Sequence, residues 1–196
     1  MSTNHFYAML SRMKYINRWG LMRNTRNENL SEHSLEVAFI AHALAIISKN
    51  KLGKDINPDT VAVAAMFHDT SEIITGDMPT PIKYFNPEIR KAYKDIEEIA
   101  ENKLISMLPE YFTNDMYNIY NADSDTMLLV KAADKISALI KCIEELNMGN
   151  KEFIDAKKST EKSLKALNLE EVNIFISEFL DSFYLSLDEQ NVVDYE

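Results

Sequence analysis

Cysteine, glycine and proline are scarce in this sequence, and each shortage excludes a class of structure. A single cysteine, Cys142, excludes an intramolecular disulfide and is typical of a protein in a reducing cytoplasm. Four glycines and five prolines leave few signals for turns, whereas leucine, isoleucine, alanine, lysine, glutamate and methionine, which suit helices, are plentiful. No segment shows the alternation of a strand over a useful length. We therefore predict an all-α, cytoplasmic protein in which Cys142 is packed in the interior.

Surplus positive charge and long apolar runs are also missing. The formal net charge is −10, which argues against binding to nucleic acid or to an anionic membrane. No apolar stretch approaches the roughly 20 residues that cross a bilayer, and the first residues lack the order of a signal peptide. The segment 1–27 is an exception to this negative charge, because it contains no acidic residue. It predicts a local site for a small anion. Its five cations are Arg12, Lys14, Arg18, Arg23 and Arg26.

The helices are predicted from capping residues and apolar periodicity. Asn29 or Ser31 begins a first helix, Asn57 and Asn86 each precede a proline at the start of another, and Ser124 begins a fourth. Because the first is apolar nearly all round beyond Glu36, it should be central and buried, and the second also contains a long apolar run. The predicted ranges are 29–48, 57–74, 86–108, 124–149, 151–167 and 170–186. Without repeats or linkers, residues 1–196 should form one domain.

Four ionisable residues interrupt the apolar pattern of these helices: His33, His68, Asp69 and Asp134. Burying a charge is unfavourable unless the charge is paired or binds a metal, and two imidazoles with two carboxylates suit a borderline divalent ion. Consecutive helical residues point about 100° apart, so one ion between His68 and Asp69 can take both as neighbouring ligands. The other two ligands must come from separate helices.

Simpler interpretations of the same residues remain open at this point. A histidine on an apolar helix is more often a hydrogen-bonded core residue than a ligand. We interpret His42 in that way, because it lies on the face opposite His33 and continues a stripe with Leu35 and Phe39. Asp134 can instead pair with a lysine on its own helix, Lys131 or Lys135.

The order of these residues resembles the H…HD…D signature of the HD-domain metal-dependent phosphohydrolases. The stretches "INRWGLMRN" (16–24), "SEHSLEVA" (31–38), "FHDTSEIITGDMPTPIKYF" (67–85) and "VKAADKISALIKCIEEL" (130–146) more closely resemble the bacterial 5'-deoxynucleotidases of that superfamily. These enzymes remove phosphate from 2'-deoxyribonucleoside 5'-monophosphates. The resemblance runs from about residue 5 to 190 and implies an HD-domain helical bundle of about six or seven helices and a homodimer. Gly20 stands where proline is expected, and Thr70 stands where a small residue such as alanine is usual.

The resemblance implies one divalent metal ion, cobalt, manganese or another transition metal, held by His33, His68, Asp69 and Asp134. Arg18 has the planar fork that suits a phosphate, and the resemblance gives it that role. Glu72 follows His68 by four residues, so we expect it on the same helical face and within reach of the metal, as the proton-transfer group. The resemblance also implies that the sugar is bound by Trp19, which crowds the 2' position, and by the loop residues Asp77, Met78, Pro79 and Thr80.

Three other functions compete with this interpretation. An HD phosphohydrolase acting on deoxynucleoside triphosphates or signalling nucleotides needs more cations for its longer phosphate chain. A dinuclear HD oxygenase needs further histidines, and the chain has none after His68. A metal-free helical binding module is the third alternative, and the intact ligand set argues against it.

Overall fold

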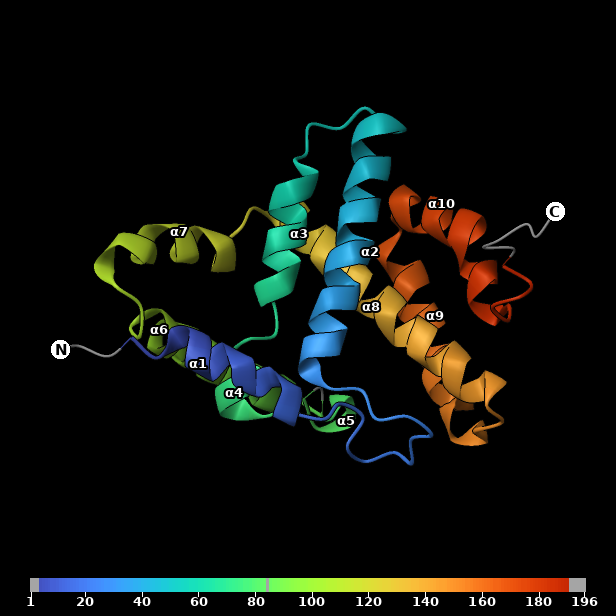
Figure 1. The fold of residues 1–196 in the computed structure, drawn as a ribbon, viewed down its shortest axis with the longest axis horizontal. Coiled ribbons are helices and arrows are strands. Elements are labelled where there is room, and N and C mark those ends of the chain that lie inside the picture. Colours follow the sequence, from blue (N-terminus) through green and yellow to red (C-terminus); the bar gives the residue numbers. More distant parts are fainter. Residues whose placement is uncertain (1–3, 84, 191–196) are drawn as a thin grey trace.

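The computed structural model describes residues 4–83 and 85–190, and its regular elements are helices (Figure 1). Three helices form the centre: α2 (Leu30–Asn50), α3 (Pro58–Phe67) and α8 (Ser124–Asn147). The other elements are α1 (Phe6–Leu10), η1 (Ser11–Tyr15), α4 (Glu72–Thr75), α5 (Thr80–Lys83), α6 (Pro87–Ile105), α7 (Glu110–Tyr120), η2 (Lys151–Phe153), α9 (Ile154–Leu167), α10 (Glu170–Phe179) and η3 (Leu180–Tyr184). The single domain over 1–196 stays a prediction, and residues 1–3, 84 and 191–196 of that range lie outside the described residues.

Side-chain caps begin the main helices largely as predicted. The Asn29 side chain accepts from the backbone N–H groups of Ser31 (3.0 Å) and Glu32 (3.1 Å), and Glu32 accepts from the Asn29 N–H, which completes a capping box. Asn57 caps α3 ahead of Pro58. The cap of α8 is one residue earlier than predicted.

The α8 cap is Asp123 rather than Ser124. Its Oδ1 accepts from the N–H groups of Asp125 (3.0 Å) and Thr126 (2.9 Å), and a carboxylate at this position also interacts favourably with the helix dipole.

The number of helices, about six or seven, was predicted too low. The short helices α1, α4 and α5 contain four or five residues each, too few to show periodicity. Helix α7 was missed because its start at Glu110 lacks a side-chain cap. The predicted helix 57–74 is also divided: α3 ends at Phe67, and α4 begins at Glu72 after a tight turn.

Two apolar clusters hold the helices together. The larger one joins α2, α3, α8 and α10 through fully buried residues such as Leu44, Val61 and Ile136. The smaller one joins α1, α6 and α7 around Phe6, on the left of Figure 1. Helix α3 contributes Ala64 and Ala65 to the first, and Phe67 packs against the second. The turn after α3 therefore lies where the two clusters meet. Cys142 is buried as predicted.

Helix α2 corrects two expectations. No apolar stretch of membrane-spanning length was predicted. Among the described residues, however, α2 is one helix whose length and composition would allow it to cross a membrane. Core helices pass the same test, and α2 packs in the larger cluster with 56% of this window buried. His42 is not a core residue: its side chain is 42% exposed, and its Nε2 lies 3.9 Å from Asp59 Oδ1. The buried face of α2 instead contains His33, Val37 and Leu44.

Candidate metal centre and nucleotide site

The structure brings the four predicted metal ligands together. His33, from α2, places its Nε2 3.5 Å from Asp69 Oδ2 and 3.3 Å from Asp134 Oδ1, which comes from α8. His68 Nε2 lies 3.1 Å from the same Asp69 oxygen. One ligand atom from each of His33, His68 and Asp134 lies within 4.8 Å of the others. Donor atoms at this spacing can share one ion.

The hydrogen bonds of the two imidazoles show that the cluster fits a cation. His68 Nδ1 lies 2.7 Å from the carbonyl oxygen of Ala65, so Nδ1 carries the proton and Nε2 presents a lone pair. His33 Nδ1 lies 3.2 Å from Ser137 Oγ and 3.3 Å from Glu28 Oε1. Both Nε2 atoms are buried without a hydrogen-bond partner among the described residues. Metal-ligating histidines have this arrangement.

The charges of the cluster are strongly coupled. Burial alone raises the pKa of Asp69, but His68 and His33 outweigh it and hold that pKa well below its usual value. Burial likewise opposes ionisation of Asp134, whose pKa is lowered to about 2 by the adjacent His33 side chain. Burial and Arg18 lower the pKa of His33, but the carboxylates around it raise it well above normal. Both aspartates are therefore anions that require a positive partner.

Arg18 lies at the edge of this cluster, in the loop after η1. Its Nη1 is 3.4 Å from Asp69 Oδ2, its Nη2 is 3.9 Å from Asp134 Oδ1, and its side chain is 13% exposed. Burial lowers the pKa of Arg18, whereas the three surrounding carboxylates of Asp69, Asp134 and Glu28 raise it. The guanidinium therefore stays charged beside the position where the ligand atoms converge.

Glu72 begins α4 and lies near Asp69, but not on a helical face shared with His68. The turn between α3 and α4 is tighter than an α-helix, because the Glu72 N–H donates to the carbonyl of Asp69 three residues earlier. Residues three apart align in such a turn. Glu72 is 4% exposed, and its Oε2 has no hydrogen-bond partner among the described residues. Burial, with the charges of Asp69 and Asp77, raises its pKa to about 9, so its carboxyl group carries a proton at neutral pH.

The predicted sugar-binding residues lie on two loops. Trp19 has a positive φ of 59°, its Nε1 donates to Glu28 Oε2 at 2.8 Å, and its ring centroid lies 5.3 Å from that of Phe153. Asp77 follows Gly76, whose φ of 74° turns the chain, and its charge acts on Arg18.

The rest of the second loop is less closely tied to the cluster. Met78 and Pro79 are half-buried, and Thr80 is exposed at the start of α5. Among the hydrogen bonds and ion pairs of the described residues, none joins these three to the metal ligands. The structure therefore places Trp19 and Asp77 beside Arg18 but leaves the contribution of the other three as a prediction.

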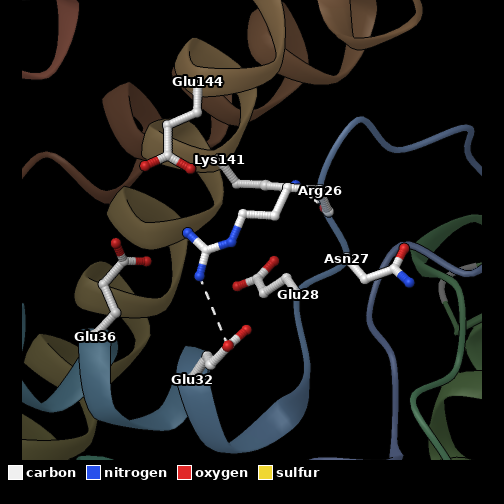
Figure 2. Close-up of a pocket in the computed structure, with 7 residues that line it drawn as sticks. All are labelled: Arg26, Asn27, Glu28, Glu32, Glu36, Lys141 and Glu144. Carbon is white, nitrogen blue, oxygen red and sulfur yellow. Dashed lines mark hydrogen bonds and ion pairs between the residues drawn. The ribbon is translucent and has the colours of Figure 1, made fainter. Parts of the chain in front are cut away.

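Sequence reasoning missed Glu28, which contacts both the predicted metal site and the predicted sugar site. A signal existed: Glu28 is the first acid after 27 residues without one. The opposite side of Glu28 faces a pocket of about 190 Å³ (Figure 2). That pocket is lined by Arg26, Asn27, Glu28, Glu32, Glu36, Lys141 and Glu144. Glu28 thus forms a wall between the pocket and His33.

Comparison with known proteins gives matches over nearly the whole chain. Residues 5–183 match the family described as 5'-deoxynucleotidase YfbR-like. A 5'-deoxynucleotidase of Vibrio cholerae serotype O1 is 53% identical over 192 residues, which cover 96% of this chain and 99% of that protein. A 5'-deoxynucleotidase of Photobacterium profundum is 52% identical with the same coverage.

Solved structures match the fold at lower identity. An HD-domain phosphohydrolase from Listeria innocua has a TM-score of 0.81 at 23% identity, covering 97% of this chain and 93% of its own. The cyanophage S-2L HD phosphohydrolase, solved with dA and one catalytic Zn²⁺ ion, has a TM-score of 0.65 at 19% identity, covering 90% of this chain and 95% of its own. These likenesses confirm the predicted helical HD-domain fold.

Proposed function

Because this chain belongs to the YfbR-like 5'-deoxynucleotidase family, we propose that it hydrolyses 2'-deoxyribonucleoside 5'-monophosphates to deoxynucleoside and phosphate. Relatives more than 50% identical over nearly the full length carry the name 5'-deoxynucleotidase, so the protein is a phosphoric monoester hydrolase. The observation that carries the mechanism is the pair of buried Nε2 atoms, on His33 and His68, that face two carboxylates without hydrogen-bond partners.

We assign one divalent metal ion to His33, His68, Asp69 and Asp134. When bound, such an ion neutralises phosphate charge and lowers the pKa of a coordinated water. The cyanophage HD phosphohydrolase, which shares this fold, was solved with one catalytic Zn²⁺ ion, and this supports a metal in the site. Imidazole and carboxylate ligands also accept manganese and cobalt, so the ion that is used depends on availability as well as affinity.

Arg18 is the group that binds the phosphate. Two aspartates compensate the charge of a divalent ion, so the substrate dianion needs a further cation. Arg18 is the cation whose guanidinium lies within 4 Å of both Asp69 and Asp134. Its planar fork matches two phosphate oxygens. Arg18 thus orients the phosphorus toward the metal side of the site and stabilises the charge that accumulates there.

Glu72 is the proton-transfer residue. It is buried next to Asp69, and one carboxyl oxygen has no partner within the described part of the chain. A carboxyl group that keeps its proton at neutral pH, as the raised pKa of Glu72 indicates, suits the acid that protonates the leaving 5' oxygen. Water supplies the oxygen that bonds to phosphorus as the bond to the 5' oxygen breaks, and the deoxynucleoside departs as a neutral alcohol.

Trp19 and Asp77 select the sugar. The indole, beside Arg18, occupies the space that a 2' hydroxyl needs, and the loop Asp77–Thr80 accepts the 3' hydroxyl. Exclusion by packing gives discrimination of only about 10²-fold, so the wall must be rigid. Base-specific hydrogen bonds are not part of the proposal, and we expect all four deoxynucleotides to be hydrolysed.

A nucleotide panel with metal-stripped protein tests this function. Protein treated with EDTA is assayed for phosphate release from dAMP, AMP, dADP and dATP, alone and after addition of single metals. We expect no activity without metal, recovery with manganese or cobalt, and selective hydrolysis of dAMP. Preferential release from dATP would favour the alternative, a triphosphate-hydrolysing HD enzyme, and full activity in EDTA would refute the metal assignment.

The remaining parts of the proposal concern assembly and location. We propose a homodimer that works in the cytoplasm. Exposed aromatic side chains on neighbouring helices, Phe39 on α2 and Phe179 on α10, support a subunit contact because they line a common apolar groove. Light scattering of the purified protein gives the mass directly, and a monomer at micromolar concentration would refute the dimer.

A further inference from the structure

Glu28 lies in the loop between η1 and α2, directly opposite Arg18. Its carbonyl oxygen accepts a hydrogen bond from the Arg18 N–H at 2.9 Å, and the flanking residues Asn17 and Asn29 form an isolated antiparallel bridge. The chain before and after the loop is therefore held at a fixed separation. This pairing brings Arg18, Trp19 and Glu28 into one small volume.

The two carboxylate oxygens of Glu28 contact different parts of the site. Oε2 accepts the indole N–H of Trp19 at 2.8 Å. Oε1 lies 3.3 Å from His33 Nδ1 and 3.9 Å from Arg18 Nε, and the side chain is 13% exposed. One buried carboxylate thus joins the predicted sugar wall to a predicted metal ligand.

The contact with Trp19 depends on Glu28 more than the contact with His33 does. His33 Nδ1 has Ser137 Oγ as a second partner at 3.2 Å, so its ring stays oriented without Glu28. The indole N–H of Trp19, by contrast, has no second acceptor among the described residues besides Glu28. Loss of Glu28 should therefore release the indole while leaving the metal ligand largely in place.

Trp19 needs such support because its backbone adopts an unfavourable conformation. A positive φ is unusual for a bulky residue and persists only where the surroundings impose it. The next residue, Gly20, has no atoms within 4 Å of the position of a Cβ, so packing there does not restrain the loop. Besides Glu28, the ring has Phe153 as an aromatic neighbour.

We propose that Glu28 is a positioning residue that sets the preference for deoxyribose over ribose by holding the Trp19 indole against the nucleotide site. The inference rests on the proposed function, in which Trp19 forms the wall beside the 2' carbon. A half-buried hydrogen bond between an indole N–H and a carboxylate fixes the rotation of the ring. Without it the indole is free to rotate away from the nucleotide site, and a 2' hydroxyl then fits.

The test compares Glu28→Ala and Glu28→Gln with the control Glu144→Ala, which changes an exposed glutamate of the same pocket (Figure 2). Trp19 is the single tryptophan of the chain, so acrylamide quenching of its fluorescence reports on this side chain alone. The other measurements are kcat/KM for dAMP and for AMP with manganese, bound metal, and the melting temperature.

We expect Glu28→Ala to raise the quenching of Trp19 and to lower the dAMP-to-AMP ratio of kcat/KM by about tenfold, part of the roughly 10²-fold that packing supplies. Bound metal should stay near one equivalent. Glu28→Gln keeps an acceptor oxygen and should restore most of the ratio, and Glu144→Ala should match the wild type. Trp19→Phe removes the N–H donor of the same hydrogen bond while Glu28 stays in place. It should lower the dAMP-to-AMP ratio of kcat/KM, and it can be measured even if Glu28→Ala does not fold.

Two results separate this inference from the proposed function. A high wild-type ratio that Glu28→Ala leaves unchanged while Trp19→Phe lowers it would overturn the role of Glu28 alone. A wild-type ratio near one would refute the sugar wall itself, and the inference with it. Wild-type quenching in Glu28→Ala would show that the carboxylate does not hold the indole.

Discussion

Replacing Glu145 by alanine should strongly destabilise the protein, although none of the predicted site residues is among its hydrogen-bond partners. The carboxylate is 1% exposed on α8 and accepts from Thr25 N at 2.9 Å, Thr25 Oγ1 at 2.8 Å and Arg26 N at 3.3 Å. Asn150 and Lys141 donate to it at 2.8 Å and 2.5 Å. Through these hydrogen bonds, Glu145 holds Thr25 and Arg26, in the loop that precedes Glu28, against α8.

Two estimates of the effect agree. Without Glu145, the buried ammonium of Lys141 keeps a single hydrogen-bond partner among the described residues, the carbonyl oxygen of Arg26 at 2.6 Å. Breaking a buried ion pair in this way costs about 3–5 kcal/mol of unfolding free energy. Burial alone raises the pKa of Glu145, but hydrogen bonds from Lys141, Asn150 and Thr25 lower it from 4.5 to about 2. That difference corresponds to roughly 3 kcal/mol. The melting temperature should fall by roughly 6–20 °C.

The pH dependence has a definite sign. Because the folded pKa of Glu145 is depressed, its stabilisation is complete above pH 4.5 and is lost as the pH falls toward 2. The difference in unfolding free energy between wild type and Glu145→Ala should therefore shrink by about half or more between pH 7 and pH 3. Urea titrations followed by circular dichroism at both pH values measure it.

The control is Glu144→Ala, which removes the neighbouring exposed carboxylate of α8 and should change stability by no more than about 0.5 kcal/mol. Glu145→Gln keeps an acceptor for Thr25 but not the charge opposite Lys141, so it should be intermediate. Equal unfolding free energies for Glu144→Ala and Glu145→Ala at pH 7 would refute the reasoning.

Three further predictions concern the site and its surroundings. Glu72→Ala should keep metal and nucleotide binding while turnover falls by about 10²–10⁴-fold, and near-normal turnover would contradict the assignment. Arg18→Lys keeps the charge but loses the fork, so kcat/KM for dAMP should fall by roughly tenfold or more, whereas Arg23→Lys, at an exposed ion pair, should match the wild type. Thr70→Ala removes the hydroxyl bonded to Tyr120 at 2.6 Å and should lower unfolding free energy by about 1 kcal/mol without affecting turnover; a thermal melt checks this.

The parts of the fold that follow from local chemistry were predictable. The side chains of Asn29 and Asn57 accept from backbone N–H groups of the first helical turn. A few neighbouring residues are therefore enough to predict where these helices begin. The four metal-ligand candidates were also visible, because ionisable residues in apolar helices violate a strong pattern. The convergence of His33, His68 and Asp134 within 4.8 Å, with Asp69 beside them, was by contrast an expectation that depended on resemblance. Spacing along the chain does not determine how α2, α3 and α8 pack.

The errors arise where a local pattern has two solutions. His33 and His42 lie on opposite faces of α2, and only packing decides which face is buried. The apolar stripe with Phe39 suggested both were internal, but Phe39 is 67% exposed. At the end of α3 the sequence "HDTSE" is compatible with a continuing helix, yet the chain tightens there, which moves Glu72 from alignment with His68 to alignment with Asp69.

Contacts between residues far apart in the sequence were invisible to pattern reasoning, and they hold the loop on which selectivity depends. Glu145 binds Thr25 across 120 positions, and Glu28 then binds Trp19 and His33 at the other end of the same loop. If this chain of contacts positions the indole, Glu145→Gln should lower the dAMP-to-AMP ratio in the same direction as Glu28→Ala, although it touches neither nucleotide nor metal. Measuring that ratio well below the melting temperature of each variant separates positioning from unfolding, and a ratio equal to that of Glu144→Ala would show that the loop keeps its shape without the buried carboxylate.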